Sequence, residues 1–218
     1  MSLFQRRARP LNRDTARLRD DRLFIVACDD TFAPKQYFEF FRVTRVKIHV
    51  VPTTDGTSVA KNVLDRLLEF DYEPDDELWM LLDTDHCAQG THLHSFTEAL
   101  RVARQRGVNV ALSKPCFEFW LLMHHLDEAA SAELTTCGEV TAKLRERLGR
   151  YDKTKLDASH YPLASVAEAC NRAERLDRTV LGGDIPNSST SRVYRLWAAI
   201  AEKALPSQLP TELRGLVP

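Results

Sequence analysis

Two short acidic clusters each follow directly on a run of apolar residues, at positions 23–28 and 78–82. The clusters contain Asp29 and Asp30 after the first run, and Asp83 and Asp85 after the second. Apolar runs of this length predict buried strands of a parallel sheet, and functional groups gather at the carboxyl ends of such strands. Asp83 and Asp85 are one residue apart, so in an extended strand both carboxylates point to the same side and can share a hard cation. The sequence therefore indicates a site for Mg²⁺ or Mn²⁺, which suits phosphodiester chemistry. The plainer alternative is that acids are common wherever a strand turns into a loop.

A single carboxylate, Glu118, lies within the apolar segment 117–122. Burying it without a partner would be costly, so we expect a hydrogen-bond partner and a role at the site. The alternative places Glu118 on the exposed stripe of an amphipathic helix. Helical spacing argues against that alternative, because Leu121 and Leu122 then fall on the same side as Glu118.

Three histidines and a cysteine near the second acidic pair could suggest zinc. They are His86, Cys87, His92 and His94. On a helix His92 and His94 face apart and no second pair of ligands is evident, so we interpret these residues as surface residues. The sequence contains no phosphate-binding glycine loop, dinucleotide fingerprint or common hydrolase motif, so we do not expect ATP hydrolysis by this chain alone.

From residue 23 onward, short apolar runs alternate with amphipathic segments, which predicts βαβ units in an α/β fold with a parallel sheet. The expected strands are 23–28, 46–51, 77–82 and 108–112. Four helices are expected in the first part of the chain: 32–42, a helix capped by Thr57 or Ser58, a helix that presents Leu93, Phe96, Leu100 and Ala103 on one face, and 113–125 with Pro115 in its first turn. Three more are expected at 139–148, 163–176 and 190–204. Pro206, Pro210 and Pro218 indicate an extended tail. We divide the chain into a flexible basic leader (1–22), an α/β core (23–126) and a helical extension packed on the core (127–218).

Bulk composition limits the class of protein. The chain has 218 residues, 44% hydrophobic, with a net charge of −1. Any nucleic-acid partner must therefore be bound through a local patch or through metal ions. No apolar stretch reaches the roughly 20 residues that a membrane-spanning helix needs, and the N-terminus has no signal-peptide core. The five cysteines are widely spaced without a C-x-x-C pair, which indicates neither a disulfide framework nor a zinc ribbon and fits a reducing cytoplasm.

Several blocks together resemble one protein family. The blocks are FIVACDD with the later Tyr37-Phe38, LWMLLDTDH, SKPCFEFWLLMHH, the segment YDKTK at 151–155, and NSST at 187–190. Across roughly residues 22–204 the chain resembles the RloB family, which is related to the Toprim fold and is similar in logic to the Toprim effectors that pair with ABC-type ATPases in bacterial phage defence. The resemblance implies a Toprim-like sheet, with a metal site in which an acid after the first strand faces the D-x-D pair. The family usually has Cys-Glu-Gly-Glu where this chain has Cys28-Asp29-Asp30-Thr31.

The resemblance also implies roles for individual residues. Asp29 takes the place of the strand-one acid, as a metal ligand and catalytic residue, Asp83 and Asp85 are metal ligands, and Glu118 is a catalytic acid. Lys153 and Lys155 are expected phosphate contacts, with solvated loop charges as the equal alternative. These roles predict an Mg²⁺-dependent or Mn²⁺-dependent nuclease that cleaves RNA or DNA in anti-phage (abortive infection) defence, under the control of an ABC-type ATPase.

Two other functions stay open on the sequence alone. The changed loop after the first strand is also compatible with a catalytically silent Toprim-like module that binds a partner protein or nucleic acid. The same acids would serve a metal-dependent phosphatase or nucleotide-processing enzyme. The sequence does not decide whether the chain forms a homo-oligomer.

Overall fold

The computed structural model describes residues 21–53, 58–85 and 92–216. These residues form a five-stranded sheet with the order β2-β1-β3-β4-β5. The first four strands are parallel, and β5 runs antiparallel to β4. The strands are β1 Arg22–Cys28, β2 Val46–Val51, β3 Glu77–Asp83, β4 Asn109–Lys114 and β5 Thr190–Ser191. The expected α/β fold with a mostly parallel sheet is confirmed.

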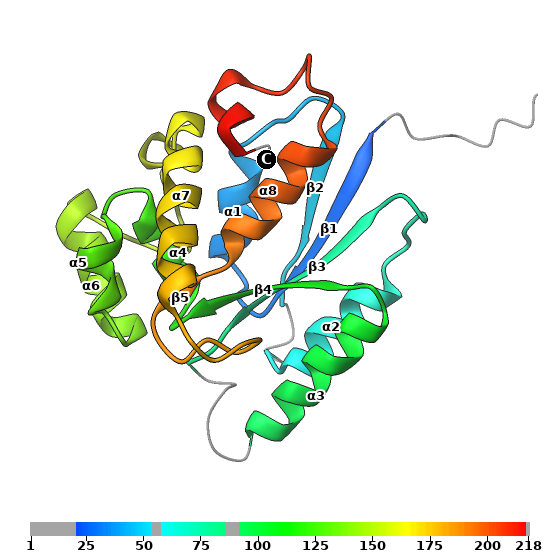
Figure 1. The fold of residues 1–218 in the computed structure, drawn as a ribbon, viewed down its shortest axis with the longest axis horizontal. Coiled ribbons are helices and arrows are strands. Elements are labelled where there is room, and N and C mark those ends of the chain that lie inside the picture. The colour runs from blue at the N-terminus through cyan, green and yellow to red at the C-terminus, as the bar shows by residue number, and fades with distance from the viewer. Residues whose placement is uncertain (1–20, 54–57, 86–91, 217–218) are drawn as a thin grey trace, which may run out of the picture.

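Helices cover both faces of the sheet (Figure 1). The α-helices are α1 Ala33–Glu39, α2 Ala60–Glu69, α3 His92–Gln105, α4 Phe117–Met123, α5 Glu128–Ala132, α6 Cys137–Leu148, α7 Leu163–Thr179 and α8 Val193–Lys203. Helices α2 and α3 pack on one face, and α1, α4, α7 and α8 on the other. Helix α6 packs against α4 farther from the sheet. Short 3-10 helices span Ala158–His160 and Thr211–Leu216.

The two apolar clusters explain why the strands read as continuous apolar runs. Alternate residues of β1 point to opposite faces, so Ile25 packs with α2 and α3 while Phe24 packs with α1 and α8. A strand covered on both faces has no polar side to present to water. Side chains of α7 and α8 belong to the same cluster as Phe24.

Several expected boundaries were wrong. Pro115 does not lie in the first turn of α4, because the helix begins at Phe117 after the N-cap Cys116, and the Pro115 carbonyl accepts hydrogen bonds from Thr84 and Asp85 instead. Helix α2 begins at Ala60 with Val59 as its N-cap, so Ser58 is not the cap, and Thr57 lies outside the described residues. Leu93, expected on the core side of α3, is 43% exposed.

The C-terminal part also differs from the expectation. Helix α8 begins at Val193 and not at residue 190, because Thr190 and Ser191 pair with Lys114 and Ser113 as the strand β5. The expected extended tail contains the 3-10 helix Thr211–Leu216. The leader lies outside the described residues, apart from positions 21 and 22. Among the described helices, none combines the length and apolarity needed to cross a membrane.

A chain of hydrogen bonds runs through the core between α8, α1 and α4. Trp197 Nε1–H donates to Tyr37 Oη (3.2 Å), and Tyr37 Oη lies 3.1 Å from His124 Nε2. His124 Nδ1 lies 2.7 Å from Ser165 Oγ, which itself donates to the Pro162 carbonyl. This order fixes the tautomer: the Tyr37 hydroxyl donates to Nε2 and Nδ1–H donates to Ser165. Burial lowers the pKa of His124 to about 3, in agreement with a neutral ring.

Replacing Tyr37 with Phe should destabilise the protein. The change leaves Trp197 Nε1–H and His124 Nε2 buried without a partner, which costs about 1–3 kcal/mol of unfolding free energy. Urea denaturation of the full chain measures the loss. Tyr72→Phe, at an exposed position, is the matched control and should change nothing. Equal stability of Tyr37→Phe and the wild type would contradict the assigned hydrogen-bond chain.

Candidate active site

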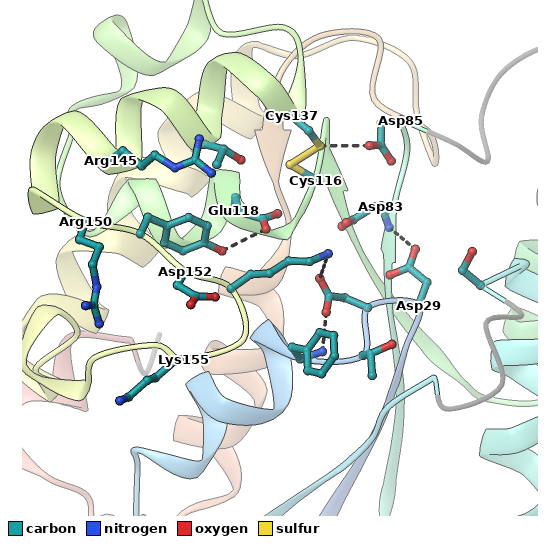
Figure 2. Close-up of a pocket in the computed structure, with 17 residues that line it drawn as sticks. Asp29, Asp83, Asp85, Cys116, Glu118, Cys137, Arg145, Arg150, Asp152 and Lys155 are labelled. Carbon is teal, nitrogen blue, oxygen red and sulfur yellow. Dashed lines mark hydrogen bonds and ion pairs between the residues drawn. A yellow bond between two sulfur atoms is a disulfide. The ribbon is translucent and has the colours of Figure 1, made fainter.

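A cavity of about 1000 Å³ opens at the carboxyl ends of β1 and β3. Six carboxylates line it (Figure 2). One of them, Asp152, lies on the exposed loop with Lys153 and Lys155, and the other five are Asp29, Asp30, Asp83, Asp85 and Glu118. They meet because β1 and β3 are neighbouring parallel strands, with Cys28 opposite Leu81, so the residues after each strand emerge at one edge. The structure therefore brings together all four acids to which metal or catalytic roles were assigned from the sequence.

The loop that carries Asp85 is held against the segment before α4. The backbone N–H groups of Thr84 and Asp85 both donate to the Pro115 carbonyl, each at 3.2 Å. Thr84 N–H also contacts the Ser113 carbonyl at 3.1 Å, which continues the pairing of β3 with β4. The D-x-D segment is thus fixed relative to α4, the helix that carries Glu118 in its first turn.

Asp29 and Asp83 are joined by a hydrogen bond across the ends of β1 and β3. The backbone N–H of Asp83 donates to Asp29 Oδ2 at 2.8 Å. Burial raises the pKa of Asp29 to about 7, although this backbone donor acts in the opposite direction. Burial also raises the pKa of Asp83 well above its ordinary value, and the nearby charges of Asp29, Glu118 and Asp85 add to the increase. A positive charge beside these two carboxylates would therefore be favourable.

Asp30 has a different role from Asp29. Its Oδ1 accepts from the backbone N–H groups of Phe32 (2.5 Å) and Ala33 (3.2 Å), at the start of α1. Its Oδ2 lies 3.8 Å from the ammonium of Lys153. Asp30 therefore positions the first helix and a cation at the edge of the cavity.

Glu118 is 7% exposed and has the partner that its apolar surroundings require. The hydroxyl of Tyr151 donates to Glu118 Oε1 at 3.0 Å. Burial raises the pKa of Glu118, which the Tyr151 hydrogen bond and the nearby Lys153 partly oppose. Tyr151 was not identified from the sequence, where its neighbours read as an ordinary turn. The signal that was present is its place in the YDKTK block.

Basic side chains line the outer part of the same cavity. They are Arg145, Arg150, Lys153 and Lys155, all exposed. The loop with the two lysines is attached to α1, because Gln36 Nε2–H donates to the Lys153 carbonyl and Leu156 N–H donates to Gln36 Oε1, both at 2.9 Å. The two arginines were missed in the sequence, since nothing in helix 137–148, which contains Arg145, or in the residues directly after it, which include Arg150, distinguishes one exposed arginine from another.

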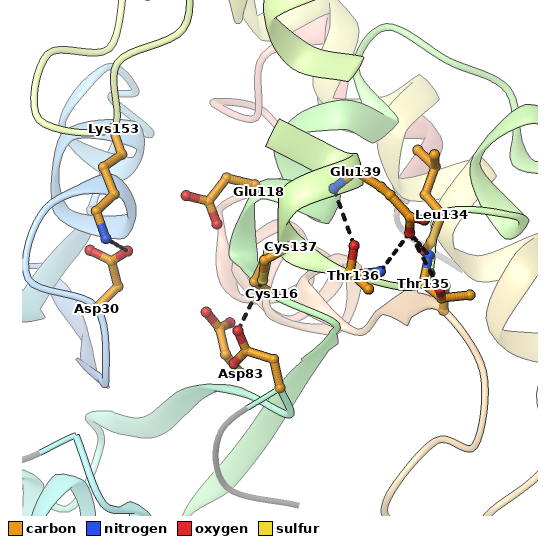
Figure 3. Close-up of a disulfide and its surroundings, with 12 residues drawn as sticks. Asp30, Asp83, Cys116, Glu118, Leu134, Thr135, Thr136, Cys137, Glu139 and Lys153 are labelled. Atoms are coloured by element: carbon orange, nitrogen blue, oxygen red, sulfur yellow. Dashed lines mark hydrogen bonds and ion pairs between the residues drawn. A yellow bond between two sulfur atoms is a disulfide. The ribbon is translucent and has the colours of Figure 1, made fainter. Parts of the chain in front are cut away.

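Two cysteines on the cavity wall form a disulfide, Cys116–Cys137 (Figure 3). The wide cysteine spacing in the sequence had indicated no disulfide framework. The fold joins these two because Cys116 precedes α4 and Cys137 opens α6, and the two helices pack together. Of the histidines and cysteine considered for zinc, His92 and His94 are exposed on α3 and do not line the cavity, while His86 and Cys87 lie outside the described residues.

The donor atoms fit a hard metal ion that keeps part of its water shell. Within residues 21–53, 58–85 and 92–216, no group of three or more His, Cys, Asp or Glu side chains is arranged to enclose a metal ion. Mg²⁺, however, is usually held by one or two carboxylates together with water and substrate phosphate. Asp83 and Asp85, with oxygen donors on one wall of an open cavity, match that mode of binding.

Comparison with known proteins places most of the chain in one family. Residues 24–200 match the family model described as RloB-like protein. Searches of curated proteins and of solved structures found no match.

The raised pKa of Asp29 makes stability depend on pH. Folded Asp29 keeps its proton up to about pH 7, whereas the unfolded chain loses it near its ordinary value of 3.8. The stabilisation is complete below about pH 4 and is lost as the pH rises through about 7. Without metal, the unfolding free energy of the wild type minus that of Asp29→Asn should therefore fall by a few kcal/mol over this range.

Urea denaturation of both proteins at several pH values measures this difference. His124, with its lowered pKa, makes stability change in the opposite direction, but it is common to both proteins and cancels. A difference that stays constant or increases with pH would refute the burial of a protonated Asp29.

Proposed function

The chain belongs to the RloB-like protein family, and we propose that it is a metal-dependent nuclease that cleaves phosphodiester bonds of RNA or DNA. The observation that carries the proposal is the convergence of Asp29, Asp30, Asp83, Asp85 and Glu118 in one cavity. The outer part of that cavity has four basic side chains and one acid, Asp152. Carboxylates suit a hard cation, and arginine and lysine suit the phosphates of a polynucleotide.

Each group of residues has a distinct part in the proposed reaction. Asp83 and Asp85 hold Mg²⁺ or Mn²⁺, with Asp29 beside them. The bound ion supplies a Lewis acid and a more acidic water. Glu118 is the proton-transfer group, because its pKa is raised and one of its oxygens is fixed by Tyr151. Lys153 and Lys155 contact phosphates, and Arg145 and Arg150 extend that contact outward.

We further propose that an ATPase partner controls the nuclease in anti-phage defence. The family resemblance supports this role, and the sequence supports a separate source of ATP hydrolysis because it has no phosphate-binding glycine loop. The outer part of the cavity has four basic side chains against one acid, Asp152. This excess of positive charge suits a substrate with many phosphates, and so it favours the nuclease over a small-molecule phosphatase.

A silent binding module is the second candidate, and two contacts favour it. Asp29 Oδ2 is occupied by the Asp83 backbone N–H, and Asp30 is paired with Lys153. A scaffold that satisfies its acids internally has less need of a metal ion. The two candidates differ in whether the cavity binds Mg²⁺.

Replacing Asp83 or Asp85 with Asn should weaken metal binding by about tenfold or more, because each removes a carboxylate from a site with few protein ligands. Calorimetric titration of the full chain with Mg²⁺ and Mn²⁺ measures the affinity. The same variants should lose cleavage of single-stranded and duplex RNA and DNA. Asp71→Asn, an exposed acid outside the cavity, is the control and should behave as the wild type.

The calorimetric result is informative even if cleavage requires a partner. Metal binding that depends on Asp83 and Asp85 supports the nuclease. Absence of Mg²⁺ and Mn²⁺ binding by the folded wild type rejects it in favour of the silent module. Cleavage that is equal in the wild type and both variants would remove these residues from the mechanism.

The basic part of the cavity should contact the nucleic-acid backbone. Arg150→Ala should weaken binding of a single-stranded oligonucleotide and reduce the slope of log affinity against log salt by about 0.7, the value for one lost phosphate contact. Fluorescence anisotropy over a range of salt concentrations measures this slope. Arg106→Ala, an exposed arginine away from the cavity, should leave it unchanged; equal slopes for the two variants would place the nucleic acid elsewhere.

A further inference from the structure

The disulfide Cys116–Cys137 lies directly beside the acidic cluster. Cys116 and Cys137 both line the cavity, and their Cα atoms are 5.8 Å apart. Asp85 Oδ2 lies 3.1 Å from Cys137 Sγ (Figure 2). A disulfide sulfur carries no hydrogen, so in the closed form it donates nothing to the carboxylate. The sulfur therefore contacts the carboxylate without donating a hydrogen bond to it.

Reduction changes the chemistry of this contact. A phosphine and water convert the disulfide to two thiols, and the phosphine becomes its oxide, so two electrons and two hydrogens reach the sulfurs. Two thiolates and one carboxylate are protein ligands that Zn²⁺ accepts, with water in the fourth position. In the closed form neither sulfur is a thiolate, so the present state cannot hold such an ion.

The distances suit a tetrahedral ion. Zinc–sulfur bonds of about 2.3 Å and zinc–oxygen bonds of about 2.0 Å place sulfur and oxygen ligands about 3.5 Å apart. The observed separation of 3.1 Å between Asp85 Oδ2 and Cys137 Sγ requires a shift of only a few tenths of an ångström. Two sulfur ligands of one ion are about 3.8 Å apart, which side-chain rotation reaches from Cα atoms separated by 5.8 Å.

The geometry points to a second metal site, formed by Cys116, Cys137 and Asp85, that binds a thiophilic divalent cation such as Zn²⁺ after the disulfide is reduced. The cavity leaves the fourth position open to water. Binding two thiols releases two protons. The proposed zinc ligands differ from His86, Cys87, His92 and His94, which lie in one stretch of sequence. Cys116 is the N-cap of α4 and Cys137 is the first residue of α6, so the packing of two helices brings them together.

The site gives the cavity a means of regulation, a consequence that rests on the proposed function. Asp85 cannot serve the hard cation while it is bound to Zn²⁺, so Zn²⁺ should compete with Mg²⁺ only in the reduced protein. Helix α6 begins at Cys137 and carries Arg145 on the same wall. Closing or opening the disulfide therefore also acts on the helix that presents this arginine.

Cobalt replaces zinc as a visible probe of thiolate ligands. The full chain is reduced with the phosphine, freed of reagent and titrated with Co²⁺, while absorption by the sulfur-to-cobalt charge-transfer band is recorded. The band should appear in the reduced wild type and be absent from the oxidised wild type. Cys137→Ser should abolish the two-thiolate spectrum, and Asp85→Asn should lower Co²⁺ affinity by about tenfold or more. Added Zn²⁺ should displace the cobalt.

Two control variants identify the cysteines involved. Cys170→Ser removes a free buried cysteine outside the cavity, and Cys87→Ser removes the thiol nearest Asp85 in the sequence; both should keep the band. Circular dichroism confirms that every variant is folded. The same spectrum in Cys137→Ser as in the reduced wild type, or loss of the band in Cys87→Ser alone, overturns the proposal. Failure of the proposed nuclease function would be seen separately, in the Mg²⁺ titration of the oxidised protein.

Discussion

The crowding of carboxylates at one edge of a buried sheet is the constraint on which the rest of the site depends. Burial is the largest cause of the raised pKa for Asp29, Asp83 and Glu118, and neighbouring negative charges add to it. Such groups must gain a proton, a hydrogen-bond donor or a cation. The protein gives Asp29 a backbone donor, Glu118 a tyrosine hydroxyl and Asp30 a lysine. Asp83, with carboxylates as its charged neighbours, is where a divalent cation would relieve the most repulsion.

The architecture that produces this crowding could be predicted well from the sequence. Strand β2 was expected at its observed bounds, and β1 and β3 each within one residue. For β1 and β3 the signal was strong, because strands covered on both faces read as continuous apolar runs. The acids at their ends followed from the convergence of loops at the carboxyl edge of a parallel sheet. The sequence of each strand and one general rule about parallel sheets were sufficient to predict where these acids lie, because the pattern that indicates a strand is local.

The features that were missed all depend on contacts between distant segments. Strand β5 has two residues and forms only because it pairs with β4, so no local sequence pattern predicts it. Tyr151 meets Glu118 across a separation of 33 residues. Cys116 and Cys137 are 21 residues apart and are joined by the packing of α4 on α6. Pro115 suited a first helical turn by type, but it lies before the helix, where its carbonyl accepts the hydrogen bonds that anchor the D-x-D segment.

The acids and their partners come from different parts of the chain, and this division determines what the cavity can do. The cavity carboxylates other than Asp152 lie between residues 29 and 118, whereas Arg145, Tyr151 and Lys153 lie in the region after α5. The sheet alone would present acids that repel one another and any polyanion. The later helices and the loop held by Gln36 add a donor for Glu118 and cations at the outer edge. A cavity that attracts a metal ion at its base and phosphate at its edge therefore requires both parts to be folded together, and Cys116–Cys137 links them at the point where they meet.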